Sequence, residues 1–443
     1  MKIDTATLPK KYLDAIDHWC RHNFTDLPLL EKYWSKYFPN DDEFCLCAKL
    51  DVATSKTVEV GDRRGEAKSE TPAELGPEAA KHLLPIIRAQ ASTEFGSIQQ
   101  HQVTIDRAQN DQDRFWVLRV MAEELRHGYQ MFHLLTSRDW SSVTDVKPED
   151  MVEDVLQMKT GSHVLEAFNL AYDSFVDNVV FAAVIDRVGK YQLTMQKVCA
   201  YRPFAQSMPP MLREEAFHLA AGVVPMRRWM ESAAKGDPFV TVRGLQHSIN
   251  KWLPRGLEMF GDERGGDTNV KLGFKDKKNL DAQTLYYKEL ERLVRDLNLR
   301  YLRARHPEKS GEVIEGMLAK LVRDPSAKGG DELLFLPHPH FFRRRGEPAY
   351  RMVGIRGESF TSVDAYLAHL AENLSEAYLA SRDMRGYADT LRELAAGTLS
   401  PEQAAKRAPK LERQSSVCPC SKSVRWVEVN GNGNGNGKGH ERR

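Results

Sequence analysis

The stretches that decide the fold are Ala122-Glu123-Glu124-Leu125-Arg126-His127 and Arg213-Glu214-Glu215-Ala216-Phe217-His218. In each, a glutamate lies three residues before a histidine. On an α-helix, residues i and i+3 lie on one face about one turn apart, so both side chains can reach the same metal ion. Two such helices, each paired with a helix that carries an inward carboxylate, build a four-helix bundle around a carboxylate-bridged di-iron site.

Each stretch also has a lone carboxylate upstream. Glu94 lies 30 residues before Glu124, and Asp186 lies 29 residues before Glu215. An antiparallel helix pair joined by a short turn brings residues at that separation back to one level. The chain therefore repeats one unit, and the predicted metal ligands are Glu94, Glu124, His127, Asp186, Glu215 and His218.

The repetition gives the motif its weight. In a chain with 14 histidines, one Glu-x-x-His is expected by chance, but here two occur and both have matched upstream carboxylates. The doubled glutamates leave a choice open, because Glu123 and Glu214 lie four residues before their histidines and on roughly the same face. We prefer Glu124 and Glu215, since this class of site uses the i, i+3 spacing.

Composition is that of an ordinary soluble protein. Of 443 residues, 41% are apolar and 28% are charged, and the net charge of +1 gives no global field that recruits nucleic acid or an anionic membrane. No apolar run approaches the roughly 20 residues that span a bilayer, and the N-terminus has no apolar signal core. We expect a cytoplasmic protein with no nucleic-acid or membrane partner.

Cysteines do not point to a second site. None of the six forms Cys-x-x-Cys, and a large cytosolic chain rarely uses disulfides. Cys418 and Cys420 in the C-terminal tail can bind a metal or form a redox pair, but two exposed thiols are the simpler interpretation.

The predicted fold class is mainly α. We expect an N-terminal cap of short helices at 1–60, a breaker-rich linker loop at 61–78, the bundle with additional helices at 79–305, a small α+β appendage at 306–410 and a disordered Gly-Asn tail at 411–443. In the bundle, helices are predicted at about 78–106, at about 111–136, within 162–201 and from Pro203 onward, with two more near 245–260 and 281–304. Pro209, Pro210 and Pro225 are expected to interrupt or kink the helix that carries Glu215. In the appendage, strands are predicted at 333–336 and 350–355 and a helix at 362–382.

Carboxylate and imidazole ligands favour iron or manganese, since soft thiolate ligands are absent from the proposed set. Four carboxylates neutralise two divalent ions, and two ferrous ions can supply two electrons to O₂. The ligand set therefore favours an O₂-activating enzyme.

Five segments carry a family resemblance: Gln90–Glu94, Glu123–His127, Ile185–Leu193, Glu214–His218 and Leu336–Phe341. They resemble the oxygenase components of the benzoyl-CoA 2,3-epoxidase family, which are ferritin-like di-iron proteins related to the catalytic subunits of phenylacetyl-CoA epoxidases. The resemblance covers about residues 80–380.

The resemblance implies a division of ligands. One iron would be held by Glu94, Glu124 and His127, and the other by Asp186, Glu215 and His218, with Glu124 and Glu215 as bridges. It also implies an O₂-dependent monooxygenase that forms an epoxide on an aryl-CoA thioester, with electrons delivered from NADPH by a separate reductase. A homodimer is compatible with it.

Two other functions stay open. One is a di-iron oxygenase that acts on another aromatic, on an arylamine or on a carrier-bound acyl chain. The other is a non-catalytic iron-binding scaffold.

Several further residues have two interpretations. His101 shares a helical face with Glu94, and we expect a buried histidine behind the ligands rather than a ligand. Arg187 and Lys190 flank Asp186, and a plain salt bridge with it is the rival account of that aspartate. The basic segments Lys275–Lys278 and Arg343–Arg345 can hold CoA phosphates, although solvated charge is the simpler account.

Overall fold

The computed structural model describes residues 2–3, 8–49, 52–261, 266–324, 332–342 and 351–407. The α-helices of this part are α1 (Lys10–Asn23), α2 (Leu27–Tyr37), α3 (Pro72–Leu75), α4 (Pro77–Thr104), α5 (Asp111–Thr136), α6 (Ser141–Thr144), α7 (Pro148–Gln157), α8 (Phe175–Val184), α9 (Asp186–Gln196), α10 (Arg202–Ala234), α11 (Val242–Met259), α12 (Gly266–Lys271), α13 (Asn279–Arg305), α14 (Gly311–Arg323), α15 (Val363–Asn373), α16 (Glu376–Leu379), α17 (Arg382–Ala395) and α18 (Pro401–Arg407). Two 3₁₀ helices are η1 (Ile105–Arg107) and η2 (Glu166–Asn169), and two short parallel strands are β1 (Lys2–Ile3) and β2 (Cys45–Leu46).

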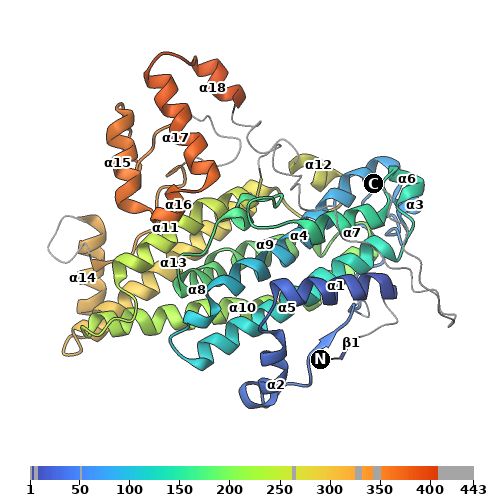
Figure 1. Ribbon diagram of the computed structural model, residues 1–443, viewed down its shortest axis with the longest axis horizontal. Helices are drawn as coiled ribbons and strands as arrows, with labels where there is room; N and C mark the ends of the chain where they lie inside the picture. The colour runs from blue at the N-terminus through green and yellow to red at the C-terminus, as the bar shows by residue number, and fades with distance from the viewer. Residues whose placement is uncertain are drawn as a thin grey trace, which may run out of the picture.

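The centre of the molecule is a four-helix bundle. Helix α4 packs against α5, and α10 packs against α5 and against the consecutive pair α8 and α9, which serves as the fourth member. Helices α11 and α13 lie outside this bundle, against α8 and α10, and the C-terminal helices α15–α18 lie to one side of it, with α16 beside α11 (Figure 1). The mainly α, ferritin-like fold predicted from the sequence is confirmed.

Local sequence explains where the ligand-bearing helices begin. The side-chain oxygen of Asn110 accepts a hydrogen bond from the backbone N–H of Asp113 at 2.9 Å, which caps α5. Two aspartates in its first turn complement the helix dipole. Helix α10 begins with Pro203 in its first turn, where the missing N–H costs nothing.

The interruption that we predicted in α10 is not found. The helix continues from Arg202 through Pro209, Pro210 and Pro225 to Ala234. An internal proline costs roughly 3 kcal/mol. Because α10 packs against α5, α8, α9 and α13, tertiary burial outweighs that local preference.

The N-terminal segment contains the expected short helices. Helix α2 packs on α5, where the rings of Tyr37 and Phe115 stack with centroids 3.9 Å apart. The segment predicted as a linker loop at 61–78 is not wholly irregular, since it contains α3 and the start of α4. Thr71 caps α3 by accepting from Glu74 N at 3.3 Å.

The two predicted C-terminal strands are wrong in the described residues. Residues 334–338 have no regular structure, and Val353 makes only an isolated bridge to Ser359. The backbone N–H of Leu334 donates to the Asn298 side chain at 2.8 Å, and that of Phe335 donates to Gln246 at 2.9 Å. Side-chain amides therefore take the place of a partner strand.

The regular elements of the appendage are helices in its described residues. It contains α14, α17 and α18, which we did not predict, and the helix predicted at 362–382 is divided into α15 and α16. Three features of the sequence lie outside the described residues: Arg343–Arg345, the pair Cys418 and Cys420, and the tail at 411–443.

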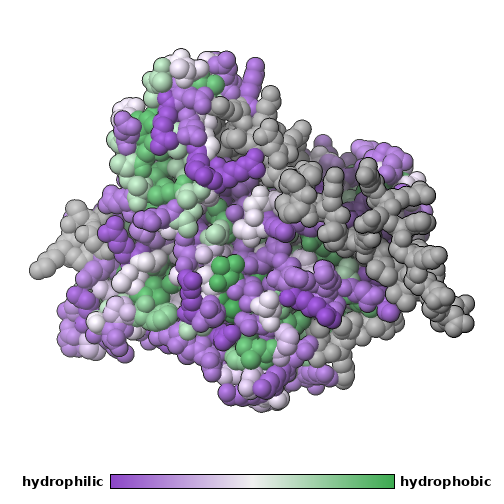
Figure 2. Space-filling view, in the orientation of Figure 1, coloured by the Kyte–Doolittle hydropathy of each residue, from purple (hydrophilic) through white to green (hydrophobic). Residues whose placement is uncertain are grey.

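The surface agrees with the composition. Hydrophilic residues predominate on the face in Figure 2, and hydrophobic residues occur there in small separate areas. Among the described helices, none combines the length and apolar character needed to cross a membrane.

A buried ion pair fastens the C-terminal helices to the bundle. Lys251 of α11 lies 2.9 Å from Asp177 of α8 and 2.8 Å from Asp173, and both Lys251 and Asp177 are almost fully buried. Ser375, just before α16, donates to Asp173 at 2.6 Å, and Trp252 donates to Asp177 at 2.8 Å. Three distant segments of the chain thus share one charge network.

We expect Asp177→Ala to lower the free energy of unfolding by about 1–3 kcal/mol, because it leaves Lys251 with only the more exposed Asp173 carboxylate and the Trp252 N–H without its acceptor. Urea unfolding followed by circular dichroism measures the change. The control is Asp389→Ala, which removes an exposed pair with Arg392 and should change little. Equal effects of the two substitutions would contradict the assigned role of the network.

Candidate dimetal site

The structure gathers five of the six predicted ligands into two groups. Glu94 of α4 meets Glu124 and His127 of α5, and Glu124 also meets Asp186 of α9 and His218 of α10. Within each group, one ligand atom from every residue lies within 4.8 Å of the others. Glu124 belongs to both groups, as a bridging ligand must.

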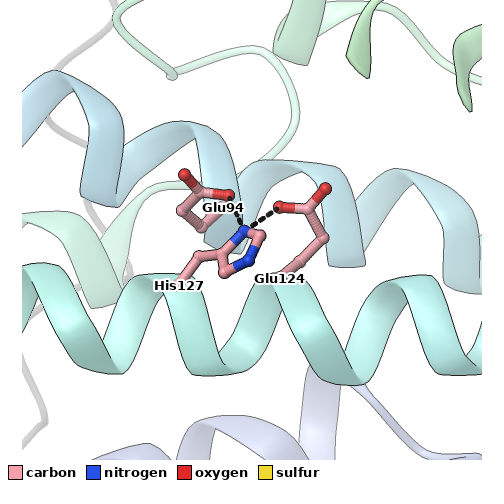
Figure 3. A group of neighbouring side chains, drawn as sticks. All are labelled: Glu94, Glu124 and His127. Carbon is pink, nitrogen blue, oxygen red and sulfur yellow. Dashed lines mark ion pairs between the residues drawn. The ribbon is translucent and has the colours of Figure 1, made fainter. Parts of the chain in front are cut away.

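The first group converges on one nitrogen. His127 Nδ1 lies 3.6 Å from Glu94 Oε2 and 3.8 Å from Glu124 Oε2 (Figure 3). Glu94 and Glu124 approach that nitrogen from different helices, and their side chains are nearly fully buried.

The second group converges on the other histidine. His218 Nδ1 lies 3.4 Å from Glu124 Oε1, 3.9 Å from Asp186 Oδ2 and 3.6 Å from Glu215 Oε2. The two oxygens of Glu124 therefore face different histidines. Glu215, the sixth predicted ligand, lies beside His218, but it is not part of either group of mutually close atoms.

Unpartnered buried atoms show that the residues fit a metal pair. In the described part of the chain, no hydrogen-bond partner is found for four of them: His127 Nδ1, His218 Nδ1, Asp186 Oδ2 and Glu215 Oε2. Buried polar groups nearly always have partners, so four such atoms in one place fit the binding of cations. Nitrogen and oxygen donors of this kind suit iron or manganese.

The first glutamate of each doubled pair has a separate place. His127 Nε2 lies 2.9 Å from Glu214 Oε2, and His218 Nε2 lies 3.2 Å from Glu123 Oε2. Each histidine of one helix therefore bonds to the outer glutamate of the other helix. This contact fixes the ring so that Nδ1 faces the inner carboxylates.

Basic side chains balance these outer glutamates. Arg119 Nε donates to Glu123 at 3.0 Å. Glu214 receives two cations, since Arg126 Nη2 lies 2.6 Å and Lys49 Nζ 3.1 Å from its Oε1. Lys49 comes from the N-terminal segment, so residues far from the ligand helices contribute charge to the site.

Burial dominates the electrostatics of the inner carboxylates. Without a metal, burial and the neighbouring Glu94 raise the pKa of Glu124 to about 7, and burial with the charge of Glu124 raises the pKa of Asp186 to about 8. Burial likewise raises the pKa of Glu215 well above its usual value. The site thus holds protons that a metal must displace.

Charge pairing favours the ionised forms of His218 and Glu214. Burial alone lowers the pKa of His218, but the bond to Glu123 and the surrounding carboxylates raise it to about 10. Burial opposes ionisation of Glu214, yet His127, Arg126 and Lys49 hold its pKa well below the usual range. An anionic Glu214 makes His127 a stronger donor ligand.

Asp186 is placed by a break in its helix. Helix α8 ends at Val184, and α9 begins at Asp186. The carbonyl of Ala183 accepts from Arg187 Nε at 2.9 Å, and the carbonyl of Val184 accepts from the Tyr286 hydroxyl at 3.2 Å. These side chains satisfy carbonyls that a helix end leaves open, and the break turns Asp186 toward His218.

Two glycines allow the close approach of α8–α9 to α10. A Cβ at Gly189 would lie 2.7 Å from Glu215 Oε1, and a Cβ at Gly222 would lie 2.4 Å from the backbone nitrogen of Ala183. Side chains there would displace either the ligand or the helix.

The rival account of Asp186 is wrong. Arg187 Nη1 pairs with Glu289 of α13, and Lys190 Nζ lies 2.9 Å from the same carboxylate. The Tyr191 hydroxyl also donates to Glu289 at 2.7 Å. These cations therefore tie α9 to α13 and leave Asp186 for the metal site.

Sequence reasoning missed several supporting residues. Glu123 and Glu214 were recognised only as alternative ligands, and the doubled glutamate was the available signal for them. Lys49, Tyr286 and Glu289 have no local motif, because they reach the site from distant segments of the chain.

Two comparisons relate the chain to known proteins. A family model described as phenylacetic acid catabolic protein matches residues 118–320, which include every predicted ligand except Glu94. A relative, benzoyl-CoA oxygenase component B of Aromatoleum evansii, is 26% identical over 326 residues, which are 66% of this chain and 67% of the relative.

We predict that the protein binds two irons per chain after reconstitution with ferrous iron. Glu124→Ala should remove both, because its oxygens face both histidines, whereas Glu94→Ala should mainly weaken one. Metal analysis after gel filtration measures this. The control is Glu231→Ala, which alters a surface pair on α10 with Arg300. Trace metal in the intact protein would refute the site.

Metal uptake should depend on pH. Glu124 and Asp186, with pKa values of about 7 and 8, carry protons at lower pH, so the apparent affinity for a divalent metal should rise as the pH increases through that range. Calorimetric titration in buffers with different ionisation enthalpies should show proton release near neutral pH. Binding without proton release would contradict the assigned protonation.

Proposed function

Both matches support this chain as a member of the phenylacetyl-CoA/benzoyl-CoA epoxidase-like family, and we propose that it is a di-iron, O₂-dependent monooxygenase that acts on an aryl-CoA thioester. The observation that carries the proposal is the position of Glu124 between His127 and His218, with one oxygen toward each. A carboxylate in that position would serve both metals of a pair, and a metal pair would suit two-electron chemistry.

Two ferrous ions held by the six ligands would supply the electrons that activate O₂. The chain itself supplies their geometry and a dry surrounding. His127 and His218 are oriented by Glu214 and Glu123, and all the inner ligands are at most 7% exposed. Exclusion of water strengthens the electrostatic interactions in the site and limits side reactions.

The proposed reaction balances as one aryl-CoA, one O₂, two electrons and two protons, giving one epoxide and one water. Each turnover therefore needs an external electron source. We propose a separate reductase that uses NADPH, because the relative is named as one component of an oxygenase.

The CoA part of the proposal rests on the name of the relative. The basic segment Lys275–Lys278 does not support it, since Lys275 is buried and donates to Gln192 and Asn279 at 2.8 and 3.1 Å. Lys277 pairs with Asp276, and Lys278 pairs with Asp267. The described residues of this segment thus have partners within the chain.

The test uses iron-loaded protein reduced chemically without O₂, so that no reductase is needed. After addition of benzoyl-CoA and ¹⁸O₂, mass spectrometry should find one labelled oxygen in the product, and free benzoate should react far less. The Glu124→Ala variant should give no labelled product.

Each other outcome excludes part of the proposal. Equal labelling of benzoate and benzoyl-CoA would remove CoA as the recognised group and favour another aromatic substrate. No labelled product from a panel of aryl-CoA, arylamine and carrier-bound substrates, with both irons bound, would favour a scaffold.

A further inference from the structure

One face of α4 carries polar atoms that lack partners. Gln90, Glu94, Ser97 and His101 follow a spacing that puts them on a single helical face. Within the described ranges, no hydrogen-bond partner is found for Gln90 Oε1, Ser97 Oγ or His101 Nε2, all of them buried atoms. Such atoms need water or a ligand, because an unsatisfied buried polar group is costly.

His101 is held with one nitrogen free for an incoming donor. The residue is fully buried, and its Nδ1 lies 2.8 Å from Asn178 Oδ1. The Asn178 amide nitrogen in turn donates to Thr104. Because the amide oxygen accepts, Nδ1 carries the proton, and burial lowers the pKa of His101 to about 4. Nε2 is therefore an acceptor at neutral pH.

Tyr172 supplies an unused donor beside it. Its ring meets that of His101 edge to face, with centroids 5.3 Å apart, and it is 5% exposed. Its hydroxyl has no hydrogen-bond partner in the part of the chain that is described. Burial and the charges of Asp186, Asp177 and Glu124 raise the pKa of Tyr172 well above its usual value, so the hydroxyl keeps its proton.

Both side chains lie near the metal ligands. The charge of Glu124 acts on His101 and on Tyr172, and that of Asp186 acts on Tyr172. Phe181 packs against both rings, and Trp252 packs against Tyr172. An acceptor on His101 and a donor on Tyr172 thus lie on two rings in contact with each other, close to the inner carboxylates.

We propose that His101 and Tyr172 hold an ordered water molecule beside the dimetal site and that this water relays protons to the reaction. A buried water typically makes two to four hydrogen bonds, and these two groups offer one of each kind. The water site stands on the contacts above, whereas the proton role rests on the proposed function.

The proposed reaction needs protons, which the held water can relay. Monooxygenation consumes two protons from solvent for each O₂, and one oxygen atom leaves as water. The ligands are too buried to exchange protons directly with bulk solvent. In the relay, the Tyr172 hydroxyl gives one proton toward the oxygen atom that becomes water, the held water gives a proton to the phenolate oxygen of Tyr172, and a proton from bulk solvent converts the remaining hydroxide back to water. His101 positions this water through Nε2.

The first experiment is structural and does not need a reaction. A high-resolution crystal structure of the protein, with or without metal, should show a water within hydrogen-bonding distance of His101 Nε2 and Tyr172 Oη. In Tyr172→Phe, which removes only the hydroxyl, the water should be lost or displaced. A direct bond between the two side chains, or a water that persists unchanged in the variant, would overturn the site.

The second experiment tests the proton role. Iron-loaded, chemically reduced protein is mixed with O₂ in H₂O and in D₂O, and its oxidation is followed by stopped-flow absorbance. Tyr172→Phe should slow oxidation by about tenfold or more and increase the solvent isotope effect, with two irons still bound. His101→Phe should change the rate in the same direction. If His101→Phe does not fold, Tyr172→Phe alone tests the proton role.

Matched controls exist in the chain. The Tyr201 hydroxyl is also buried, with no partner among the described residues, but it packs against Trp140. His163 is also buried, and burial lowers its pKa to about 4. Tyr201→Phe and His163→Phe should leave the rate unchanged. Unchanged oxidation in Tyr172→Phe would overturn the proton role, whereas absence of iron in the parent protein would instead refute the proposed function.

Discussion

The concentration of negative charge between α4, α5, α9 and α10 is the constraint on which the rest of the structure depends. Glu94, Glu124, Asp186 and Glu215 are all at most 7% exposed. Burying even one carboxylate costs several kcal/mol unless it is paired or protonated. Four of them are stable together only when they hold protons or cations. Without metal, burial and the neighbouring charges raise the pKa values of Glu124 and Asp186, and two divalent ions would offset this cost.

Charge alternates outward from this centre. The inner carboxylates face Nδ1 of His127 and His218, and the Nε2 atoms face Glu214 and Glu123. Those glutamates face the guanidinium groups of Arg119 and Arg126 and the ammonium group of Lys49. Because each outer glutamate bonds to the histidine of the opposite helix, the same contacts that orient the ligands also hold α5 against α10. These hydrogen bonds therefore contribute both to the geometry of the candidate site and to the packing of α5 against α10.

The backbone departs from regular helix next to the site, between α8 and α9. The break between α8 and α9 costs helical hydrogen bonds, which Arg187 and Tyr286 replace. Arg187 also pairs with Glu289, so α13 supports the break from outside the bundle. Gly222 and Gly189 remove the side chains that would keep α10 away. The irregular backbone is tolerated here because side chains from α9 and α13 donate hydrogen bonds to its carbonyl groups.

The sequence by itself determined the mainly α class, the bounds of α5 and the repeated carboxylate and Glu-x-x-His unit, because i, i+3 geometry is fixed within any helix. It did not decide which member of each doubled glutamate faces the histidine Nδ1 atoms. Glu123 and Glu124 point about 100° apart, and only the position of α10 gives each its partner. The local apolar pattern likewise predicted a strand at 333–336, where Asn298 and Gln246 instead satisfy the backbone. The supporting roles of Lys49, Tyr286 and Glu289 were also decided by tertiary structure. Their contacts join segments that are far apart in the sequence, and no periodic pattern relates those segments.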